Sequence, residues 1–281
     1  MTDGGTPRAP APMRDLGQRI ASAAALAFVV LAALWVGGLT FATMVGAIGV
    51  VVAWEWGRIV RQAGVDAIMI IQAIAVAAGV LLAAKGLAGL GFIAVVVAAI
   101  ISALLAFGER GHMAALGALY AGLPAVALVW LNRGDAAGFL AVLFLLLTVW
   151  ATDTGAYFAG RLIGGHRLMP SVSPNKTWSG LAGGIVAGGL VGLVFALARP
   201  ELSARHMIIA GALLAVVSQA GDLLESALKR EYGVKDASAL IPGHGGFMDR
   251  IDGLAAAVIA AAIFAIAVDI QAPARALLGL N

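Results

Sequence analysis

The sequence contains no cysteine among its 281 residues. This absence excludes disulfide bonds, thiolate nucleophiles and cysteine-ligated zinc sites. Histidine is also scarce: only His112, His166, His206 and His244 are present, and none of them belongs to an HExxH pair. A zinc hydrolase of that type is therefore disfavoured.

Charged side chains make up only 12% of the chain, whereas 62% of its residues are hydrophobic. Soluble domains carry roughly 25% charged residues. The composition therefore predicts an all-α integral membrane protein, a bundle of helices that crosses the bilayer many times. The net charge of +3 comes without a basic tail or an aromatic-interleaved basic patch, so we expect no nucleic-acid partner.

Nine mostly apolar runs follow one another along the chain, each close to the ~20 residues that a membrane-spanning helix requires. They cover residues 20–37, 40–57, 67–84, 87–107, 114–131, 137–158, 179–198, 207–228 and 254–271. Little more than Gly37 and Gly38 joins the first two runs, which predicts a helical hairpin. Residues 1–19 are predicted to be a disordered cytoplasmic head rather than a signal peptide, since no clear cleavage site ends the first run. We expect residues 20–281 to form one transmembrane domain, with its catalytic half at about 150–255.

The Lys and Arg residues are distributed unevenly between alternate connecting segments. With the N-terminus in the cytoplasm, thirteen of them lie on cytoplasmic segments and five on the opposite side. Because positive charge favours the cytoplasmic side, we expect this orientation. The expected location, which the charge pattern does not itself show, is the inner (plasma) membrane of a bacterium. Trp54 and Trp56, at the far end of the second run, are typical of an aromatic belt at the membrane surface. The polar segments 159–178 and 229–253 then both face the cytoplasm.

Residues 226–252 concentrate the polar chemistry of the chain. This stretch carries four cations and a glycine-rich PGHGG run that includes His244, which suit a ligand with several phosphates. The cations are Lys229, Arg230, Lys235 and Arg250. Asp222, Asp249 and Asp252 would repel such a ligand unaided, so the mixture predicts a bridging divalent cation, most simply Mg²⁺. The alternative is a solvated loop with ordinary surface charges.

If the run before this stretch is helical, its polar side chains share one face. They fall at positions i, i+3, i+4 and i+7 and are Asp222, Glu225, Ser226 and Lys229. An otherwise apolar helix would thus present a polar stripe as it leaves the membrane.

A second polar cluster joins the sixth and seventh runs. Asp153 and Thr154 lie within an apolar run, where a carboxylate indicates function unless it merely meets water at a helix end. Ser173, Lys176 and Thr177 precede a helix start, which suits an anion bound at a helix N-terminus. Helix capping by Ser or Thr is the structural alternative.

Four glycines recur at every fourth position of the seventh run. They are Gly180, Gly184, Gly188 and Gly192. Such rows allow helix backbones to pack closely in lipid, either inside one chain or across a homodimer.

The two polar clusters together resemble the phosphatidate cytidylyltransferase (CDP-diacylglycerol synthase) family. The matching residues of the second half are Ser226, Leu228, Lys229, Arg230, Lys235, Asp236, Ser238, Ile241, Pro242, His244, Gly245, Gly246, Phe247, Asp249, Arg250, Ile251 and Asp252. The earlier cluster adds Asp153, Thr154, Ala156, Tyr157, Gly160, Leu168, Pro170, Ser173, Pro174, Lys176 and Thr177. One departure is Ser179, where the family often carries Glu or Gln.

The resemblance implies that CMP passes from CTP to phosphatidate, giving CDP-diacylglycerol and pyrophosphate. It supports Asp222 and Asp249 as ligands of Mg²⁺. The cations, Ser173, Thr177 and Ser226 are then candidates for binding phosphate, with Lys229 and His244 closest to the chemistry. Glu225 and Asp252 are candidates for supporting the metal ligands; for Glu225 a structural pairing with Lys229 is the alternative. Asp153 and Asp236 are candidates for orienting cations or joining a second, monovalent ion site.

Two alternatives from other classes remain at the level of sequence. Acids within the sixth and eighth runs could line the path of an ion-coupled transporter, although no inverted repeat is visible. Another membrane transferase that acts on a phosphorylated lipid is the second alternative. The density of matched motif positions favours the cytidylyltransferase.

Overall fold

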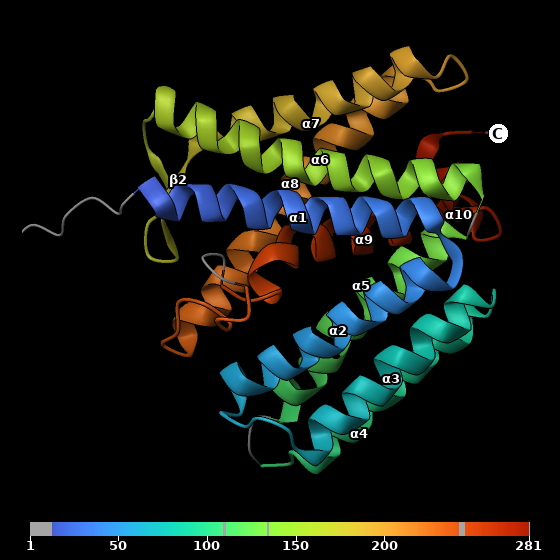
Figure 1. Cartoon of the computed structure of the whole chain (residues 1–281), viewed down its shortest axis with the longest axis vertical. Helices are drawn as coiled ribbons and strands as arrows, with labels where there is room; N and C mark the ends of the chain where they lie inside the picture. The colour runs from blue at the N-terminus through green and yellow to red at the C-terminus, as the bar shows by residue number, and fades with distance from the viewer. Residues whose placement is uncertain (1–12, 109–110, 134, 242–244, 281) are drawn as a thin grey trace, which may run out of the picture.

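The computed structural model describes residues 13–108, 111–133, 135–241 and 245–280. Within them the chain is a bundle of helices with one small hairpin of strands, as the composition predicted (Figure 1). The elements are α1 (Met13–Val36), α2 (Gly38–Val60), α3 (Ala67–Ala84), α4 (Ala88–Leu105), α5 (Gly111–Asn132), α6 (Ala136–Leu162), β1 (Arg167–Met169), β2 (Ser173–Thr177), α7 (Trp178–Ala198), α8 (Ala204–Glu231), α9 (Met248–Asp269) and α10 (Pro273–Leu278).

Eight of these helices, α2 to α9, are long and apolar enough to cross a membrane. The predicted first span is represented in α1 by the shorter apolar stretch Ser22–Val36. Of the predicted disordered head, residues 1–12 lie outside the described part of the chain, whereas 13–19 differ from the prediction because they belong to α1. The nine predicted runs thus each correspond to one helix.

The helices form two groups with α9 between them. Helices α2 to α5 pack against one another, and α6 to α8 form a second group, while α9 contacts members of both. Only Gly37 separates α1 from α2, with φ of 67° in the left-handed region that glycine adopts readily. Figure 1 shows that the two helices then diverge, with α1 running beside α6, so they are joined as predicted but do not form a tightly packed hairpin.

The glycine row of α7 packs inside the chain. A side chain at Gly188 would meet the backbone oxygen of Gly211 in α8, and one at Gly180 would meet the carbonyl of Ala156 in α6. Helix α7 is therefore held closely between α6 and α8, as expected for small residues at helix contacts in lipid. This is the intramolecular use of the row; a homodimer stays a prediction.

The polar segments gather at one end of the bundle, drawn on the left in Figure 1. The strand hairpin, the C-terminal end of α8 and the first turn of α9 all lie there. The hairpin is antiparallel, with Arg167 opposite Thr177 and Met169 opposite Ser173. The sequence indicated only a polar connection at this point. The fold thus brings both predicted polar clusters together at the same end.

Candidate active site

Helix α8 supplies the polar stripe that its spacing predicted. Ser226 donates a hydrogen bond to Asp222 one turn earlier, over 3.3 Å, and Lys229 pairs with Glu225 over 2.7 Å. Both pairs have the i, i+4 spacing that places side chains on one helix face. Four polar side chains therefore leave α8 in one direction, toward α9.

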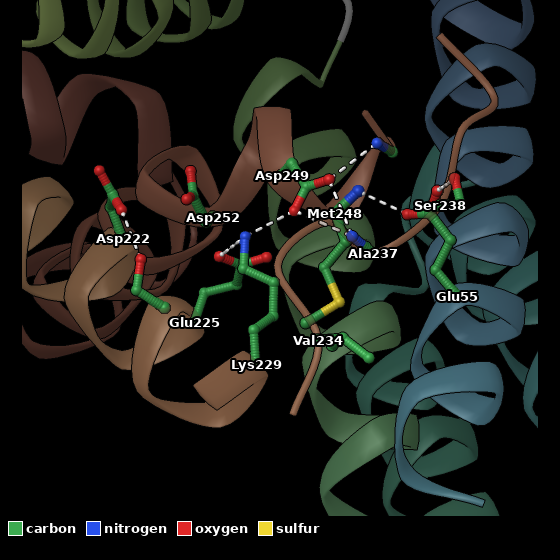
Figure 2. Close-up of polar contacts among 12 residues, drawn as sticks. Glu55, Asp222, Glu225, Lys229, Val234, Ala237, Ser238, Met248, Asp249 and Asp252 are labelled. Carbon is green, nitrogen blue, oxygen red and sulfur yellow. Dashed lines mark hydrogen bonds and ion pairs between the residues drawn. The ribbon is translucent and has the colours of Figure 1, made fainter. Parts of the chain in front are cut away.

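Lys229 joins α8 to the start of α9. Its ammonium nitrogen lies 2.7 Å from Glu225 and 2.6 Å from Asp249, and the side chains of these two acids are only 1% and 5% exposed (Figure 2). Ion pairs removed from water to this degree are sensitive to the loss of one partner, because the other charge stays buried. Lys229 was predicted to contact phosphate. In this arrangement both its neighbours are carboxylates, and it cross-links the two helices.

Asp249 holds the segment that precedes α9. Besides Lys229, its carboxylate accepts hydrogen bonds from the backbone N–H of Ala237, at 3.0 Å, and of Gly246, at 2.8 Å. Gly245 has φ of 80°, and a side chain there would collide with the same carboxylate. The glycines of the motif thus let the backbone close around Asp249.

Glu55 is a site residue that the sequence interpretation missed. It lies in α2, is fully buried, and accepts hydrogen bonds from the N–H groups of Phe247 and Met248, at 3.0 and 2.6 Å. It also accepts one from the hydroxyl of Ser238 (Figure 2). Because α9 has no cap from its own flanking side chain, Glu55 satisfies its first N–H groups from a distant helix.

The second polar cluster reaches α8 through one ion pair. Lys176 in β2 lies 2.6 Å from Asp222, so a predicted phosphate ligand and a predicted metal ligand are in contact. Thr177 accepts a hydrogen bond from the N–H of Gly180 and caps α7, which is the structural alternative considered for this residue. Ser173 begins β2 in the same hairpin.

Carboxylates outnumber cations where these elements meet. The charges of Asp222, Glu225 and Asp153 all act on Asp252, and Figure 2 shows Asp252 between Asp222 and Asp249. The cations that act on these acids are Lys176, Lys229 and Arg250. With every group ionised, five acids face three cations, a formal excess of two negative charges that suits a divalent cation.

The donor set therefore fits Mg²⁺, which binds through one or two carboxylates together with phosphate oxygens. Two buried hydroxyls beside the acids, those of Tyr120 and Ser218, have no hydrogen-bond partner among the described residues. Within the same residues no group of three or more His, Cys, Asp or Glu side chains is close enough to form a complete protein cage. Asp222 and Asp249 each already contact a lysine, so a metal would displace or share these contacts.

The remaining predicted residues lie around this cluster or outside the residues that the structure describes. Arg230, Lys235, Asp236 and Arg250 are exposed. Arg230 donates to the backbone carbonyls of Val172 and Val234, which places it near the strand hairpin. His244 lies outside the described residues.

Comparison with known proteins places this site in a family context. The model of the cytidylyltransferase family matches residues 17–268. A phosphatidate cytidylyltransferase of Brucella suis biovar 1 is 39% identical over 248 residues, which cover 87% of this chain and 91% of that protein. A protein of the same name from Bacillus subtilis is 40% identical over 147 residues, or 52% of this chain and 54% of its own. One from Haemophilus influenzae is 45% identical over 126 residues, 43% of this chain and 44% of its own.

Proposed function

Because the chain belongs to the cytidylyltransferase family and is a nucleotidyltransferase, we propose that it transfers CMP from CTP to phosphatidate. An oxygen of the phosphatidate phosphate attacks the α-phosphorus of CTP. The bond from that phosphorus to the β-phosphate oxygen breaks, so the products are CDP-diacylglycerol and pyrophosphate. The names of the relatives support this reaction over the transporter and the other lipid transferases considered from the sequence.

The observation that carries the proposal is the cluster of acids and cations at one end of an otherwise apolar bundle. A phosphate monoester has its second pKa at about 6, so much of the lipid phosphate is already a dianion at neutral pH. The reaction therefore needs no strong general base, and the lack of a reactive cysteine is no obstacle. The site has to position two anions that repel each other and neutralise their charge.

The exposed cations of the cluster are suited to the phosphates. Arg230, Lys235 and Arg250 carry their charges at the surface of the site, where phosphates can reach them. The ammonium group of Lys176 lies beside Asp222. If a metal ion bound Asp222 instead, Lys176 would be free to contact a phosphate. Within the proposal, His244 donates a hydrogen bond or a proton to the leaving group, and Ser173, Thr177 and Ser226 line the phosphate path.

Mg²⁺ would be held by Asp222 and Asp249, with Asp252 and Glu225 as supporting acids. When bound, the ion would neutralise negative charge on the phosphates and stabilise charge that develops on the leaving pyrophosphate. Asp153 and Asp236 would orient the cations of the site or join a second, monovalent ion site. Asp249 also accepts hydrogen bonds from the N–H groups of Ala237 and Gly246. Its proposed role as a metal ligand therefore requires one carboxylate to bind both the metal and these N–H groups.

We place the reaction at the cytoplasmic face of a bacterial inner membrane. The distribution of Lys and Arg along the sequence and the bacterial relatives support this location. At that surface the lipid reaches the site from the membrane and presents its phosphate, while CTP arrives from water.

The proposal is tested by incubating the purified protein with phosphatidate, Mg²⁺ and CTP labelled at its α-phosphate. We expect label to enter the chloroform-soluble lipid, and we expect EDTA to abolish this incorporation until Mg²⁺ is restored. A folded, monodisperse preparation that never yields labelled lipid would overturn the assigned reaction. Incorporation that persists undiminished in EDTA would overturn the metal dependence alone.

A further inference from the structure

A cavity of about 550 Å³ lies between α1, α2, α5, α6 and α9. Its walls are almost entirely apolar and include Ala27, Ile48, Leu128, Trp150 and Leu254, one from each of these helices. Ligand-binding cavities in proteins usually measure roughly 300–1,000 Å³, so the space is large enough for part of a lipid. Apolar walls exclude the triphosphate and the ribose of a nucleotide, because desolvating such groups without partners is costly.

The cavity has one polar end. Its polar lining residues are Asp153, Thr154 and Arg250. The Thr154 hydroxyl donates to the carbonyl of Trp150 in its own helix, so it is already satisfied. Arg250 is exposed, and in the described part of the chain its guanidinium makes neither a hydrogen bond nor an ion pair. The nearby charge of Asp153 acts on it without direct contact.

This polar end adjoins the charged cluster. Arg250 follows Asp249 in the first turn of α9, and Phe247, whose N–H binds Glu55, also lines the cavity. Asp153 in turn lies close enough for the charge of Asp222 to act on it. A negatively charged group held by Arg250 would therefore sit at the boundary between the apolar cavity and the site where CTP is proposed to react.

We propose that the cavity binds the acyl portion of phosphatidate and that Arg250 binds its phosphate. The occupant is a diacyl lipid whose head is a phosphomonoester: the walls match hydrocarbon, and the unpaired guanidinium of Arg250 matches a small dianion. A lipid with a bulky zwitterionic head would place a cation beside Arg250. The reaction that follows binding rests on the proposed function, whereas the binding of the lipid does not require that reaction.

Helix α1 provides the wall that can be tested most cleanly. Its lining residues Ala23, Leu26, Ala27 and Val30 recur at i, i+3, i+4 and i+7, which is one face of a helix. Ala25 lies about 200° around the helix from Ala27, is exposed, and does not line the cavity. Substitutions at these two alanines therefore form a matched pair on the two sides of α1.

The experiment uses the full chain in phosphatidylcholine nanodiscs and phosphatidate that carries a photoactivatable diazirine on one acyl chain. We expect adducts on cavity-lining residues of α2, α5 and α9, competed by unlabelled phosphatidate and not by added phosphatidylcholine. Ala27→Trp should reduce these adducts by about tenfold, whereas Ala25→Trp should leave them unchanged. Arg250→Gln should keep adducts in the cavity but remove the preference for phosphatidate.

Three results would overturn the assignment. They are adducts confined to the outer surfaces of α3 and α4, equal competition by phosphatidylcholine, and equal effects of the two tryptophan variants. The readout is independent of turnover. If adducts form as expected while no labelled CDP-lipid is ever made, the lipid site stands and the proposed reaction fails. If CMP transfer occurs without these adducts, the reaction stands and the cavity assignment fails.

Discussion

Asp249→Asn is expected to lower CMP transfer by about 100-fold or more while leaving the helical bundle folded. The carboxylate accepts hydrogen bonds from Lys229, Ala237 and Gly246, and an amide would turn an N–H toward one of these donors. Removing one partner of a buried ion pair typically costs about 3–5 kcal/mol of stability, which should displace the start of α9 locally. A 100-fold loss of rate corresponds to about 2.7 kcal/mol in the reaction barrier. The measurement is kcat/KM for CTP, with helix content checked by circular dichroism.

Asp269→Asn is the matched control, because Asp269 is the exposed last residue of the same helix, α9. It should retain the activity of the unmodified protein. Raising Mg²⁺ separates the two roles proposed for Asp249. Partial rescue would indicate a lost metal ligand, whereas no rescue, together with a similar loss in Lys229→Met, would indicate a lost structural link. Full activity of Asp249→Asn would refute both roles.

Glu55→Gln is expected to reduce kcat by about 100-fold, although Glu55 lies in α2, far along the sequence from both motifs. Its two oxygens accept from Phe247, Met248 and Ser238. Glutamine offers one oxygen in place of two, so at least one N–H of the first turn of α9 would face an N–H donor. Hydrogen bonds to charged groups contribute about 1.5–3 kcal/mol each, so the segment before α9 should lose its position.

A positioning role predicts a specific pattern for this variant. The kcat should fall more than the KM for CTP changes, because the role proposed for Glu55 is to hold the segment before α9 rather than to bind a substrate. Ser238→Ala removes only one of the three hydrogen bonds and should cost about tenfold or less. Glu201→Gln, an exposed glutamate in the connection between α7 and α8, serves as the control and should have no effect. Wild-type kcat in Glu55→Gln would contradict the positioning role.

The fold was predictable from the sequence because hydropathy determines it at the level of helices. Each apolar run became one helix, and the spacing of Asp222, Glu225, Ser226 and Lys229 placed them on one face of α8 as expected. The extent of α1 and the strand hairpin were not predictable in the same way. Both depend on tertiary contacts and backbone pairing that hydropathy does not record.

The contacts of the site were less predictable than its composition. The sequence indicated that acids and lysines gather here, but it could not show that Lys229 would bond to Asp249 or Lys176 to Asp222. Glu55 could have been identified from the sequence, because it is an acid within an apolar run, between Trp54 and Trp56. The two tryptophans indicated only the membrane surface, whereas the structure shows the glutamate turned inward to cap α9.

The fate of each phosphate of CTP tests the central claim most directly. Parallel reactions with phosphatidate would contain CTP labelled either at the α-phosphate or at the γ-phosphate. The account predicts that only the α-label enters the lipid, while the γ-label appears in pyrophosphate in equal molar amount. A lipid labelled from the γ-phosphate, or pyrophosphate released without labelled lipid, would contradict it.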